Sequence, residues 1–310
     1  MVRESAEGLP FVSVIIPVYN DPLGLDRCLQ ALTKQTCGVG RFEVLVVDNG
    51  SDPESRPPDE YPPLEYRLLD EPVPGSYMAR NHGVRHARGQ VLAFTDADCR
   101  PIETWIDAGT GCLTEEMIGA ATGPVEIDFR NPRRPTAIEL YESLHAFTQE
   151  ENATKRGFGV TANLFVPAGL WKTVGEFDEA LASGGDLEWG GRLTAKGFMV
   201  RYCSDARVFH PARESWSLYS RRIWRLLEGY DARRRRSGYG ALHFVADLIS
   251  VWFRVLRSPI IAWRNLRHVG GLSAMLKYVL ASVATAVIST YARLAIRLGV
   301  TRGSRFERAR

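Results

Sequence analysis

Residues 91–101 read VLAFTDADCRP, and this stretch decides how the rest of the chain is interpreted. Val91–Thr95 is a short apolar run of the kind found in strands buried on both faces, and it leads directly into Asp96-Ala97-Asp98. In open α/β sheets, ligands bind beyond the carboxyl ends of the strands. We therefore expect Asp96 and Asp98 at the ligand-binding edge of a sheet.

Two earlier segments show the same pattern. Residues 12–18 (VSVIIPV) and 42–47 (FEVLVV) are apolar on both faces, and leucines recur at helical spacing between them. This order predicts strand, helix, strand in a parallel sheet. The second run ends at Asp48, so Asp48 is expected to share one crevice with Asp96 and Asp98.

The pair Asp96-x-Asp98 has the chemistry of a metal site. Hard divalent cations such as Mg²⁺ or Mn²⁺ take one or two protein carboxylates together with water and substrate phosphates. Such a cation neutralises a departing diphosphate. Aspartates are also common in solvated turns and caps, but the position after a buried strand and the company of Asp48 favour the metal site.

Three further residues are candidates for chemistry. Arg80, on a helix expected at 78–88, can make charge-assisted contacts with a diphosphate or lie on a solvated helix face. Asp186 follows two glycines where a helix should begin, so it is either an N-cap or a general base. His210 follows a strand-like run and either completes the cation's shell or is structural.

Five segments in this order resemble the family 2 glycosyltransferases: SVIIPVYND (13–21), VLVVDNGSD (44–52), ARNHGVRHARG (79–89), VLAFTDADCRP (91–101) and VGEFDEALASGGDLEWGGRL (174–193). The resemblance covers residues 11–212. It implies the α/β, Rossmann-like GT-A fold, with a mixed, mostly parallel sheet flanked by helices. It also implies a nucleotide-diphosphate sugar as donor, a divalent cation (Mn²⁺ or Mg²⁺) as cofactor, and inversion at the anomeric carbon.

The resemblance assigns one set of residues to the nucleotide. Pro17, Tyr19 and Asn20 would border it, and Asp48 would contact the base or the ribose. Arg80 would lie near the base or the diphosphate.

A second set is assigned to the metal and the reaction. Asp98 would bind the cation, Asp96 would approach the ribose and the cation, and His210 is a further candidate ligand. Asp186 would deprotonate the acceptor hydroxyl. Many relatives have Glu-Asp at that place, whereas here Gly185 precedes Asp186, so Glu188 is a second candidate base.

The segment Ser220-Arg221-Arg222-Ile223-Trp224 departs from the Q-x-x-R-W motif of processive polysaccharide synthases in this family. Addition of one sugar is therefore expected rather than polymerisation. Arg221 or Arg222 remains a candidate for contact with a diphosphate.

The charge of the chain divides at residue 212. Residues 1–212 hold 20 Lys and Arg against 31 Asp and Glu, whereas residues 213–310 hold 19 against 5. We expect a catalytic domain at 1–212 and a basic, amphipathic helical region at 213–310. Its Arg-rich, aromatic start, with the run Arg233–Arg236, suits nucleic acid or lipid, but no nucleic-acid motif accompanies it, so a membrane surface is favoured.

Leu272–Ala292 has 21 residues and one charge, Lys277. It is long enough to span a bilayer, but Ser, Thr and Ala dilute its hydrophobicity. Three placements stay open: on the membrane as an interfacial or re-entrant helix, across it, or packed against the catalytic domain or another copy in a homo-oligomer.

The five cysteines are odd in number and lack C-x-x-C spacing, so neither a disulfide framework nor a zinc site is expected. The opening MVRESAEGLP has no apolar core of a signal peptide. Both features predict a protein at the cytoplasmic face of the membrane.

The predicted function is transfer of one sugar from a nucleotide-diphosphate sugar to a hydroxyl acceptor. The acceptor is expected to be a polysaccharide or a lipid-linked saccharide of the bacterial envelope or of an exopolysaccharide. The alternatives are a nucleotidyltransferase on a related sheet and a non-catalytic scaffold that binds nucleotide sugars. The motifs leave the nucleotide, the sugar and the acceptor open.

Overall fold

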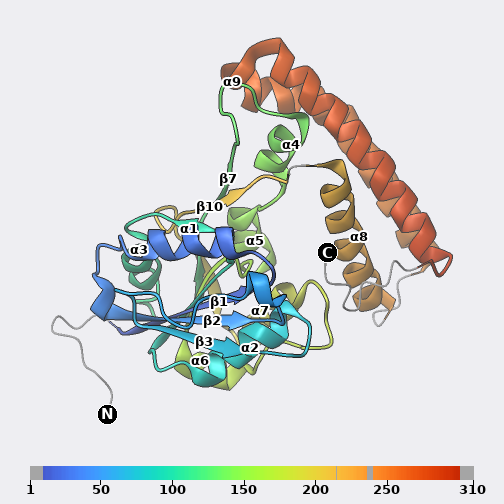
Figure 1. Cartoon of the computed structure of the whole chain (residues 1–310). Helices are drawn as coiled ribbons and strands as arrows, with labels where there is room; N and C mark the ends of the chain where they lie inside the picture. Colours follow the sequence, from blue (N-terminus) through green and yellow to red (C-terminus); the bar gives the residue numbers. More distant parts are fainter. Residues whose placement is uncertain (1–9, 214, 236–239, 301–310) are drawn as a thin grey trace. The chain divides into compact units, whose positions relative to one another are not determined.

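The computed structural model describes residues 10–213, 215–235 and 240–300, which form two compact units (Figure 1). The sheet unit comprises residues up to Glu126, Phe147–Leu181 and Gly185–His210. The helical unit comprises Ile127–Ala146, Ala182–Gly184 and residues from Pro211 onward. The sequence placed 127–146 with the catalytic domain, whereas the structure groups these residues with the C-terminal helices.

The sheet unit is built on a seven-stranded mixed sheet in the order β3-β2-β1-β4-β8-β6-β9. Its strands are β1 (Val12–Val18), β2 (Phe42–Asp48), β3 (Tyr66–Asp70), β4 (Val91–Thr95), β6 (Ile118–Thr122), β8 (Asn163–Pro167) and β9 (Met199–Tyr202). The first four are parallel, β8 is antiparallel to both β4 and β6, and β6 pairs parallel with β9. The mixed, mostly parallel sheet expected from the sequence is therefore present.

Helices cover both faces of this sheet, which explains why the central strands carry apolar residues on both faces. Val14 and Ile16 pack toward α1 (Pro22–Leu32) and α3 (Trp105–Gly111), and Ile15 packs on the opposite face. The helices of that opposite face are α2 (Ser76–His86), α5 (Gln149–Arg156), α6 (Ala168–Val174) and α7 (Gly185–Ala195). Two short 3₁₀ helices, η1 (Val39–Arg41) and η2 (Pro53–Ser55), lie in the loops around β2.

The order of the strands defines where a ligand can bind. From β1 the chain builds β2 and β3 on one side, and then returns through α2 to place β4 on the other side of β1. Such a switch point leaves a crevice at the carboxyl ends of the two central strands. A second sheet, β5 (Arg100–Pro101), β10 (Val208–Pro211) and β7 (Val125–Asp128), begins directly after β4.

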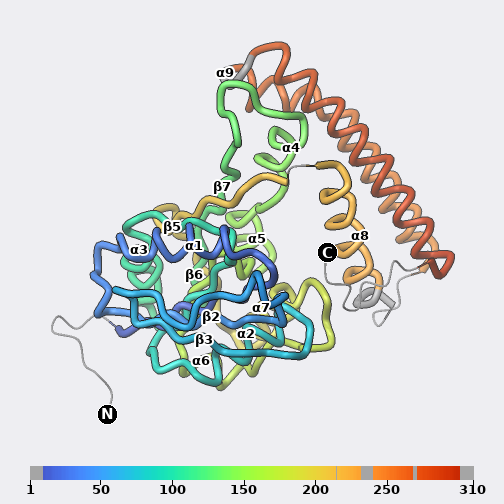
Figure 2. The backbone as a smooth tube through the Cα atoms, in the orientation of Figure 1, coloured from blue at the N-terminus to red at the C-terminus, as the bar shows by residue number. Residues whose placement is uncertain are grey.

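The helical unit consists of α4 (Ala137–His145), α8 (Trp216–Arg235) and α9 (Ala241–Arg297). Although α9 is one assigned helix, Gly271 has a φ of +58°, and the chain reverses there into two arms that run side by side (Figure 2). An ion pair of 2.9 Å between Asp247 and Arg293 fixes the register of the arms. The sequence pattern over 137–151 predicts one helix, but the structure forms two helices there, α4 and α5, which belong to different units.

The two arms are apolar on both sides, but they bury one side alone. Leu266, Ala274 and Tyr278 pack with α4, and Ala292 and Ile296 pack with α4 and α8. The opposite side carries large apolar residues that are exposed, and we call it the exposed apolar face. Its members are Ile249, Trp252, Phe253, Leu256, Ile260 and Trp263 in the first arm, and Leu276, Leu280, Val283, Val287 and Tyr291 in the second.

In the described part of the chain, the second arm, Gly271–Arg297, has the length and composition to cross a bilayer. One third of its most apolar window, 33%, is buried against the rest of the unit. The arm therefore contributes to a protein core and also presents apolar side chains outward.

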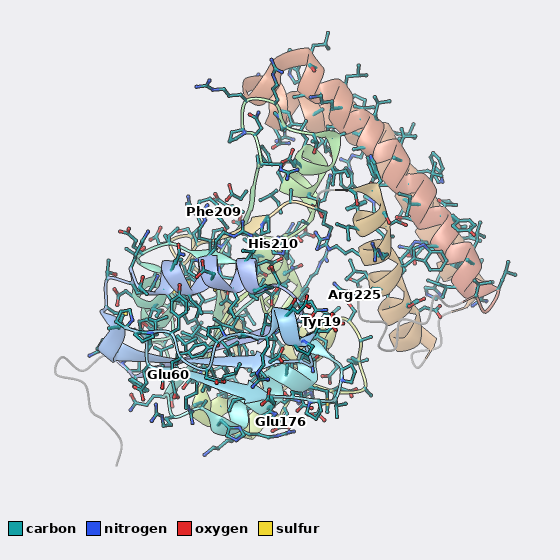
Figure 3. The ribbon with its side chains drawn as sticks, in the orientation of Figure 1. Tyr19, Glu60, Glu176, Phe209, His210 and Arg225 are labelled. Carbon is teal, nitrogen blue, oxygen red and sulfur yellow. A yellow bond between two sulfur atoms is a disulfide. The ribbon has the colours of Figure 1, made fainter. Side chains whose placement is uncertain are left out.

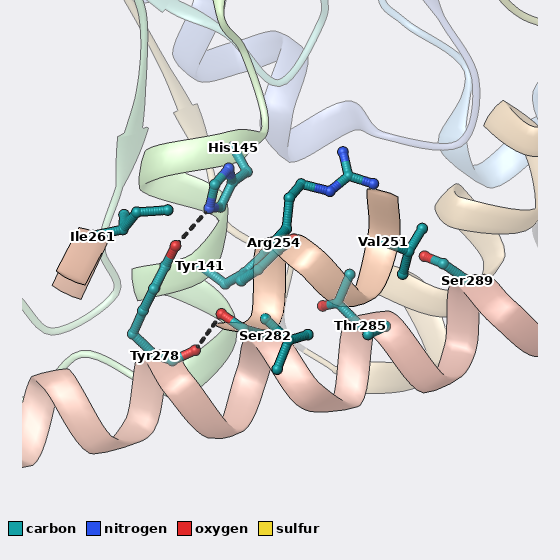
Figure 4. A pocket seen from close by; sticks show the side chains of 11 residues that line it. Tyr141, His145, Val251, Arg254, Ile261, Tyr278, Ser282, Thr285 and Ser289 are labelled. Atoms are coloured by element: carbon teal, nitrogen blue, oxygen red, sulfur yellow. Dashed lines mark hydrogen bonds between the residues drawn. The ribbon is translucent and has the colours of Figure 1, made fainter. Parts of the chain in front are cut away.

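A cavity of about 30 Å³ lies inside the helical unit between α4 and the two arms (Figure 4). His145 and Tyr278 border it, and the His145 Nε2 lies 2.7 Å from the Tyr278 hydroxyl. Burial and the nearby Arg254 lower the pKa of His145 to about 4. The imidazole is therefore neutral at pH 7.

The cysteines correct one expectation. Cys112, at the end of α3, and Cys203, which follows β9, form a disulfide with a Cα–Cα distance of 6.5 Å. Cys28, Cys37 and Cys99 are free. The sequence predicted no disulfide framework and did not indicate this single pair, because its partners are 91 residues apart and meet through the fold rather than through a local spacing.

Two features singled out in the sequence fall partly outside the described residues. The opening segment contributes Pro10 alone to the structure, and the arginine run ends at Arg236, which lies beyond the described part of α8. What the sequence predicts for these two segments therefore stays a prediction.

Candidate active site

Carboxylates gather directly after β4. One donor atom from each of Asp96, Asp98 and Cys99 lies within 4.8 Å of the others. Asp98 Oδ2 is also 3.3 Å from Nε2 of His210, on β10. The antiparallel pairing of β10 with β5, in which Phe209 lies opposite Arg100, brings His210 beside the end of the Asp96–Asp98 turn.

These donors fit a hard divalent cation. Carboxylate oxygens and an imidazole nitrogen are ligands that Mn²⁺ and Mg²⁺ sites accept, Mg²⁺ preferring the oxygens. Burial raises the pKa of the Cys99 thiol well above its usual value, with Asp98 and Asp96 adding to the effect. His210 is 6% exposed, and its ring centroid lies 5.0 Å from that of Phe147.

Arg80, on α2, forms an ion pair with Asp96. Its Nη1 donates to the carbonyl of Ser76 at 3.2 Å, and its guanidinium lies 5.8 Å from the centroid of the Tyr77 ring. Its buried Nε has no hydrogen-bond partner in the described part of the chain. Arg80 therefore brings a buried positive charge to the carboxylates.

Asp186 lies in the first turn of α7, which begins at Gly185, so it is not the N-cap, which was one of its two candidate roles. Its Oδ1 accepts from the amide of Leu187 at 2.9 Å and from the hydroxyl of Tyr77 at 3.4 Å. Burial raises the pKa of the Asp186 carboxyl, while the Leu187 amide, Arg80 and Tyr77 oppose that rise. A carboxylate with a raised pKa is a stronger base than an exposed one.

Gly185 explains why the residue before Asp186 is not a glutamate here. A Cβ at position 185 would lie 2.8 Å from the ring of Tyr77, closer than real Cβ contacts allow. Tyr77 therefore occupies the space that a side chain at 185 would need.

Glu188, the second candidate base, is engaged elsewhere. Both of its oxygens bind Arg192, at 2.8 and 3.0 Å. Arg192 also donates to the carbonyls of Val174 and Glu176. Residues two apart on a helix point in roughly opposite directions, so Glu188 does not join Asp186. We therefore do not propose Glu188 as the base.

The residues expected at the nucleotide lie at the end of β1. Pro17 is within the strand, and Tyr19 and Asn20, both half-buried, follow it. Figure 3 labels Tyr19. Asn20 has a φ of +50°, and its backbone amide donates to the hydroxyl of Ser51 at 2.9 Å. Its side chain exchanges two hydrogen bonds with Asp52. The loops after β1 and β2 are thereby held together.

Asp48 ends β2 and lies opposite Val18 of β1 in the parallel register. It is 4% exposed, and its Oδ1 accepts a hydrogen bond from the backbone amide of Ser51 at 3.2 Å. Arg56 approaches its other oxygen at 3.7 Å and also binds Asp70. Asp48 thus reaches the same sheet edge as the β4 carboxylates.

Sequence reasoning missed Tyr77, Phe147 and Arg56. Tyr77 precedes Arg80 by three positions on α2, so the helical period placed both on one face and was a usable signal. Phe147 and Arg56 lie in connections without periodicity. Nothing in the sequence indicated their contacts.

The sheet order and the carboxylates beyond β4 define a GT-A fold, the fold of transferases that use nucleotide sugars. Residues 13–163 match the model of glycosyl transferase family 2. The glycosyltransferase AglE of Haloferax volcanii is 40% identical over 210 residues, which cover 66% of this chain and 68% of that protein. The chain belongs to glycosyltransferase family 2 and is a glycosyltransferase.

Two other comparisons extend the picture. Validoxylamine A glucosyltransferase of Streptomyces hygroscopicus subsp. jinggangensis is 29% identical, and the chain spans 55% of its length. The mannosyltransferase PcManGT from Pyrobaculum calidifontis, solved with GDP-Man and Mn²⁺, is 21% identical, with a TM-score of 0.57 over 98% of this chain and 84% of that one. This last likeness supports the fold.

Proposed function

We propose that this glycosyltransferase moves one sugar from a nucleotide-diphosphate sugar to a hydroxyl acceptor, with inversion. Asp98, Asp96 and His210 would hold Mn²⁺ or Mg²⁺, and Asp186 would be the base. Pro17, Tyr19, Asn20 and Asp48 would border the nucleotide.

The observation that carries this proposal is the 3.3 Å approach of His210 to Asp98. These residues come from distant segments and meet at the switch point of the sheet, where a donor diphosphate would bind. A cation bound there would neutralise charge that develops on the leaving diphosphate. Arg80, paired with Asp96, would add a positive charge to the same group.

Asp186 is suited to accept the proton of the acceptor hydroxyl. Tyr77 and the Leu187 amide orient its carboxylate, and burial raises its pKa toward that of a useful base. Inversion requires one base and a single displacement at the anomeric carbon of the donor sugar.

Membership of family 2 sets the nucleotidyltransferase alternative aside. The scaffold alternative is separated from the enzyme by hydrolysis of the donor. The wild-type protein should slowly release nucleoside diphosphate from its nucleotide sugar with Mn²⁺, and Asp98→Ala should reduce this release to background. Asp205→Ala, at an exposed aspartate of the same unit, is the matched control and should keep it. If Asp98→Ala still releases nucleoside diphosphate at the wild-type rate, a metal site that includes Asp98 is excluded.

The donor nucleotide can be identified in the same preparation. A ligand that binds the folded state alone raises the melting temperature. Thermal unfolding with Mn²⁺ and each of UDP, GDP, CDP and dTDP should single out one nucleotide, and the shift should disappear in Asp98→Ala. Equal shifts for every nucleotide in both proteins would contradict a specific site.

The helical unit is proposed to hold the enzyme at the cytoplasmic face of a membrane, near a lipid-linked acceptor. The exposed apolar face carries eleven large apolar residues that are each more than a third exposed, and the unit is rich in arginine. Basic residues near an anionic leaflet contribute on the order of 1 kcal/mol each. Because the two arms bury their other side against α4 and α8, we propose that they lie on the bilayer and do not cross it.

A further inference from the structure

Two short stretches of chain flank the candidate cation ligand His210. One is the end of α4, which leads through Ala146 into Phe147, and the other is Pro211–Arg213, which follows His210. Each contact described below lies within one unit, and the peptide chain joins the contacts. Together they form a set that we call the His210 clamp: Glu142, Arg213, Arg222 and Phe147.

Glu142 and Arg213 form the first half of the clamp. The carboxylate of Glu142 is fully buried, at 0% exposed. Its Oε2 accepts the backbone amide of Arg213 at 2.9 Å, and its Oε1 pairs with the Arg213 guanidinium. One carboxylate therefore fixes both the main chain and the side chain of a residue three positions after His210.

Arg222 and Phe147 form the second half. Arg222 donates to the carbonyl of Ala146 at 2.9 Å and approaches the same oxygen of Glu142 at 3.9 Å. Burial lowers the pKa of Arg222 to about 10, so it stays charged at neutral pH. A cation at a helix carboxyl end is stabilising, so Arg222 fixes the end of α4. The next residue, Phe147, places its ring 5.0 Å from that of His210.

We propose that Glu142, Arg213, Arg222 and Phe147 are positioning residues that orient the His210 imidazole toward Asp98. The inference rests on the proposed function, because it takes His210 as a ligand of the cation. Ligand histidines depend on surrounding contacts for their orientation, and loss of such a contact typically costs roughly 10- to 100-fold in metal affinity. Here the orientation comes from ring packing on one side and from the tethered strand end on the other.

A purely structural ion cluster would behave differently. Glu142 with two arginines would then stabilise the helical unit, and its loss would lower the melting temperature without an effect on the cation. Removing Glu142 outright would leave two buried charges unbalanced, which is strongly destabilising. Milder variants are therefore needed. Arg213→Lys keeps the charge and the backbone bond to Glu142 but removes the guanidinium contact, and Phe147→Leu keeps apolar volume but removes the ring contact.

The test measures binding of Mn²⁺ alone to the full chain, by the electron paramagnetic resonance signal of the free ion. We expect Arg213→Lys and Phe147→Leu each to weaken Mn²⁺ binding about tenfold or more. Arg134→Lys, at an exposed arginine of the helical unit before α4, is the matched control and should bind as the wild type. Circular dichroism confirms that each variant is folded.

A double-mutant cycle shows whether the effect passes through His210. In a His210→Ala background, Arg213→Lys and Phe147→Leu should cause no further loss of Mn²⁺ affinity, because the group they orient is gone. If His210→Ala itself leaves Mn²⁺ binding unchanged, the metal site of the proposed function fails. If His210→Ala weakens binding while folded Arg213→Lys and Phe147→Leu bind within twofold of the wild type, the clamp is excluded and the metal site stands.

Discussion

The two units of this chain use apolar side chains in opposite ways. In the sheet unit Leu25, Leu29 and Leu32 are all buried against the sheet, whereas in the helical unit Leu256 is 75% exposed and Leu280 is 59% exposed. The first unit hides its hydrophobic surface and collects its carboxylates at one sheet edge. The second unit leaves much of its hydrophobic surface outside. The contrast supports the proposal that the second unit contacts a membrane while the first carries out the chemistry.

The largest expected effect concerns the sheet unit. Asp186→Asn keeps the hydrogen bonds of the side chain but removes the base, so transfer to the acceptor should fall about 10³-fold while the KM for the donor stays unchanged. The assay follows labelled sugar from the identified donor into a lipid extract. Because burial raises the pKa of Asp186, the wild-type rate should fall on the acid side at a pH above the usual range of an aspartate.

Glu188→Gln is the matched control for this prediction. Glu188 lies on the same helix and binds Arg192, so its loss should change the rate less than tenfold. A larger loss in Glu188→Gln than in Asp186→Asn would reverse the assignment of the base.

The disulfide should stabilise the sheet unit and leave the stability of the helical unit unchanged. Cys112 and Cys203 close a loop with a sequence separation of 91, and both lie in the sheet unit. In the chain-entropy model, Cys112→Ser should lower the free energy of unfolding by about 4 kcal/mol. Urea unfolding with hydrogen exchange as readout should show the loss in the sheet strands and not in α9. Cys37→Ser, at a free cysteine, is the control.

The same pair tests the proposed location. A reducing cytoplasm keeps most thiols unpaired. Alkylation of protein taken directly from cells should then find Cys112 and Cys203 reduced. If they are already bonded, the proposed cytoplasmic location fails.

Strands and strand-end carboxylates were predictable, because both depend on local pattern. Val91–Thr95 is as apolar as a doubly covered strand must be, and Asp96 and Asp98 follow it in sequence. His210 could be named as a candidate but not placed, since its approach to Asp98 depends on the pairing of β10 with the very short β5. A two-residue strand has no period to detect.

Other misses have similar causes. The break between α4 and α5 contains neither glycine nor proline, so the helix appeared continuous in sequence. The reversal of α9 did have a signal, because Gly271 belongs to a pair of adjacent glycines. The disulfide and the packing of Phe147 on His210 join distant segments and had none.

Acid should affect the helical unit before it affects the disulfide-bonded sheet unit. The pKa of His145 is about 4 in the folded state, below its reference value of 6.5, so folding favours the neutral ring. Its contribution to stability is complete above pH 6.5 and is lost as the pH falls toward 4. The full shift of the His145 pKa corresponds to a loss of roughly 3 kcal/mol in the free energy of unfolding.

His145→Gln isolates this effect, because glutamine can bond the Tyr278 hydroxyl but does not titrate near neutral pH. Between pH 6.5 and 4, hydrogen exchange of α4 and α9 should rise more steeply in the wild type than in His145→Gln. Parallel profiles for the two proteins would show that His145 is not the group responsible.

The smallest effect concerns the exposed apolar face. Leu256→Ser should weaken binding to vesicles with anionic phosphatidylglycerol about tenfold, since partial burial of one leucine in lipid is worth roughly 1 to 2 kcal/mol. Leu23→Ser is a matched control, because Leu23 is also 75% exposed but lies on α1 of the sheet unit. Sedimentation with vesicles measures both.

Salt separates the two forces that act at this face. Higher ionic strength should weaken binding of the wild type and of Leu256→Ser by the same factor, because it screens the arginines and leaves the apolar contact intact. If Leu23→Ser and Leu256→Ser lose affinity equally, exposed leucines of both units contribute alike and the contrast between the units does not extend to membranes. If neither protein binds vesicles while the chain sediments as a dimer that Leu256→Ser dissociates, the exposed apolar face is instead a contact between two copies of the chain.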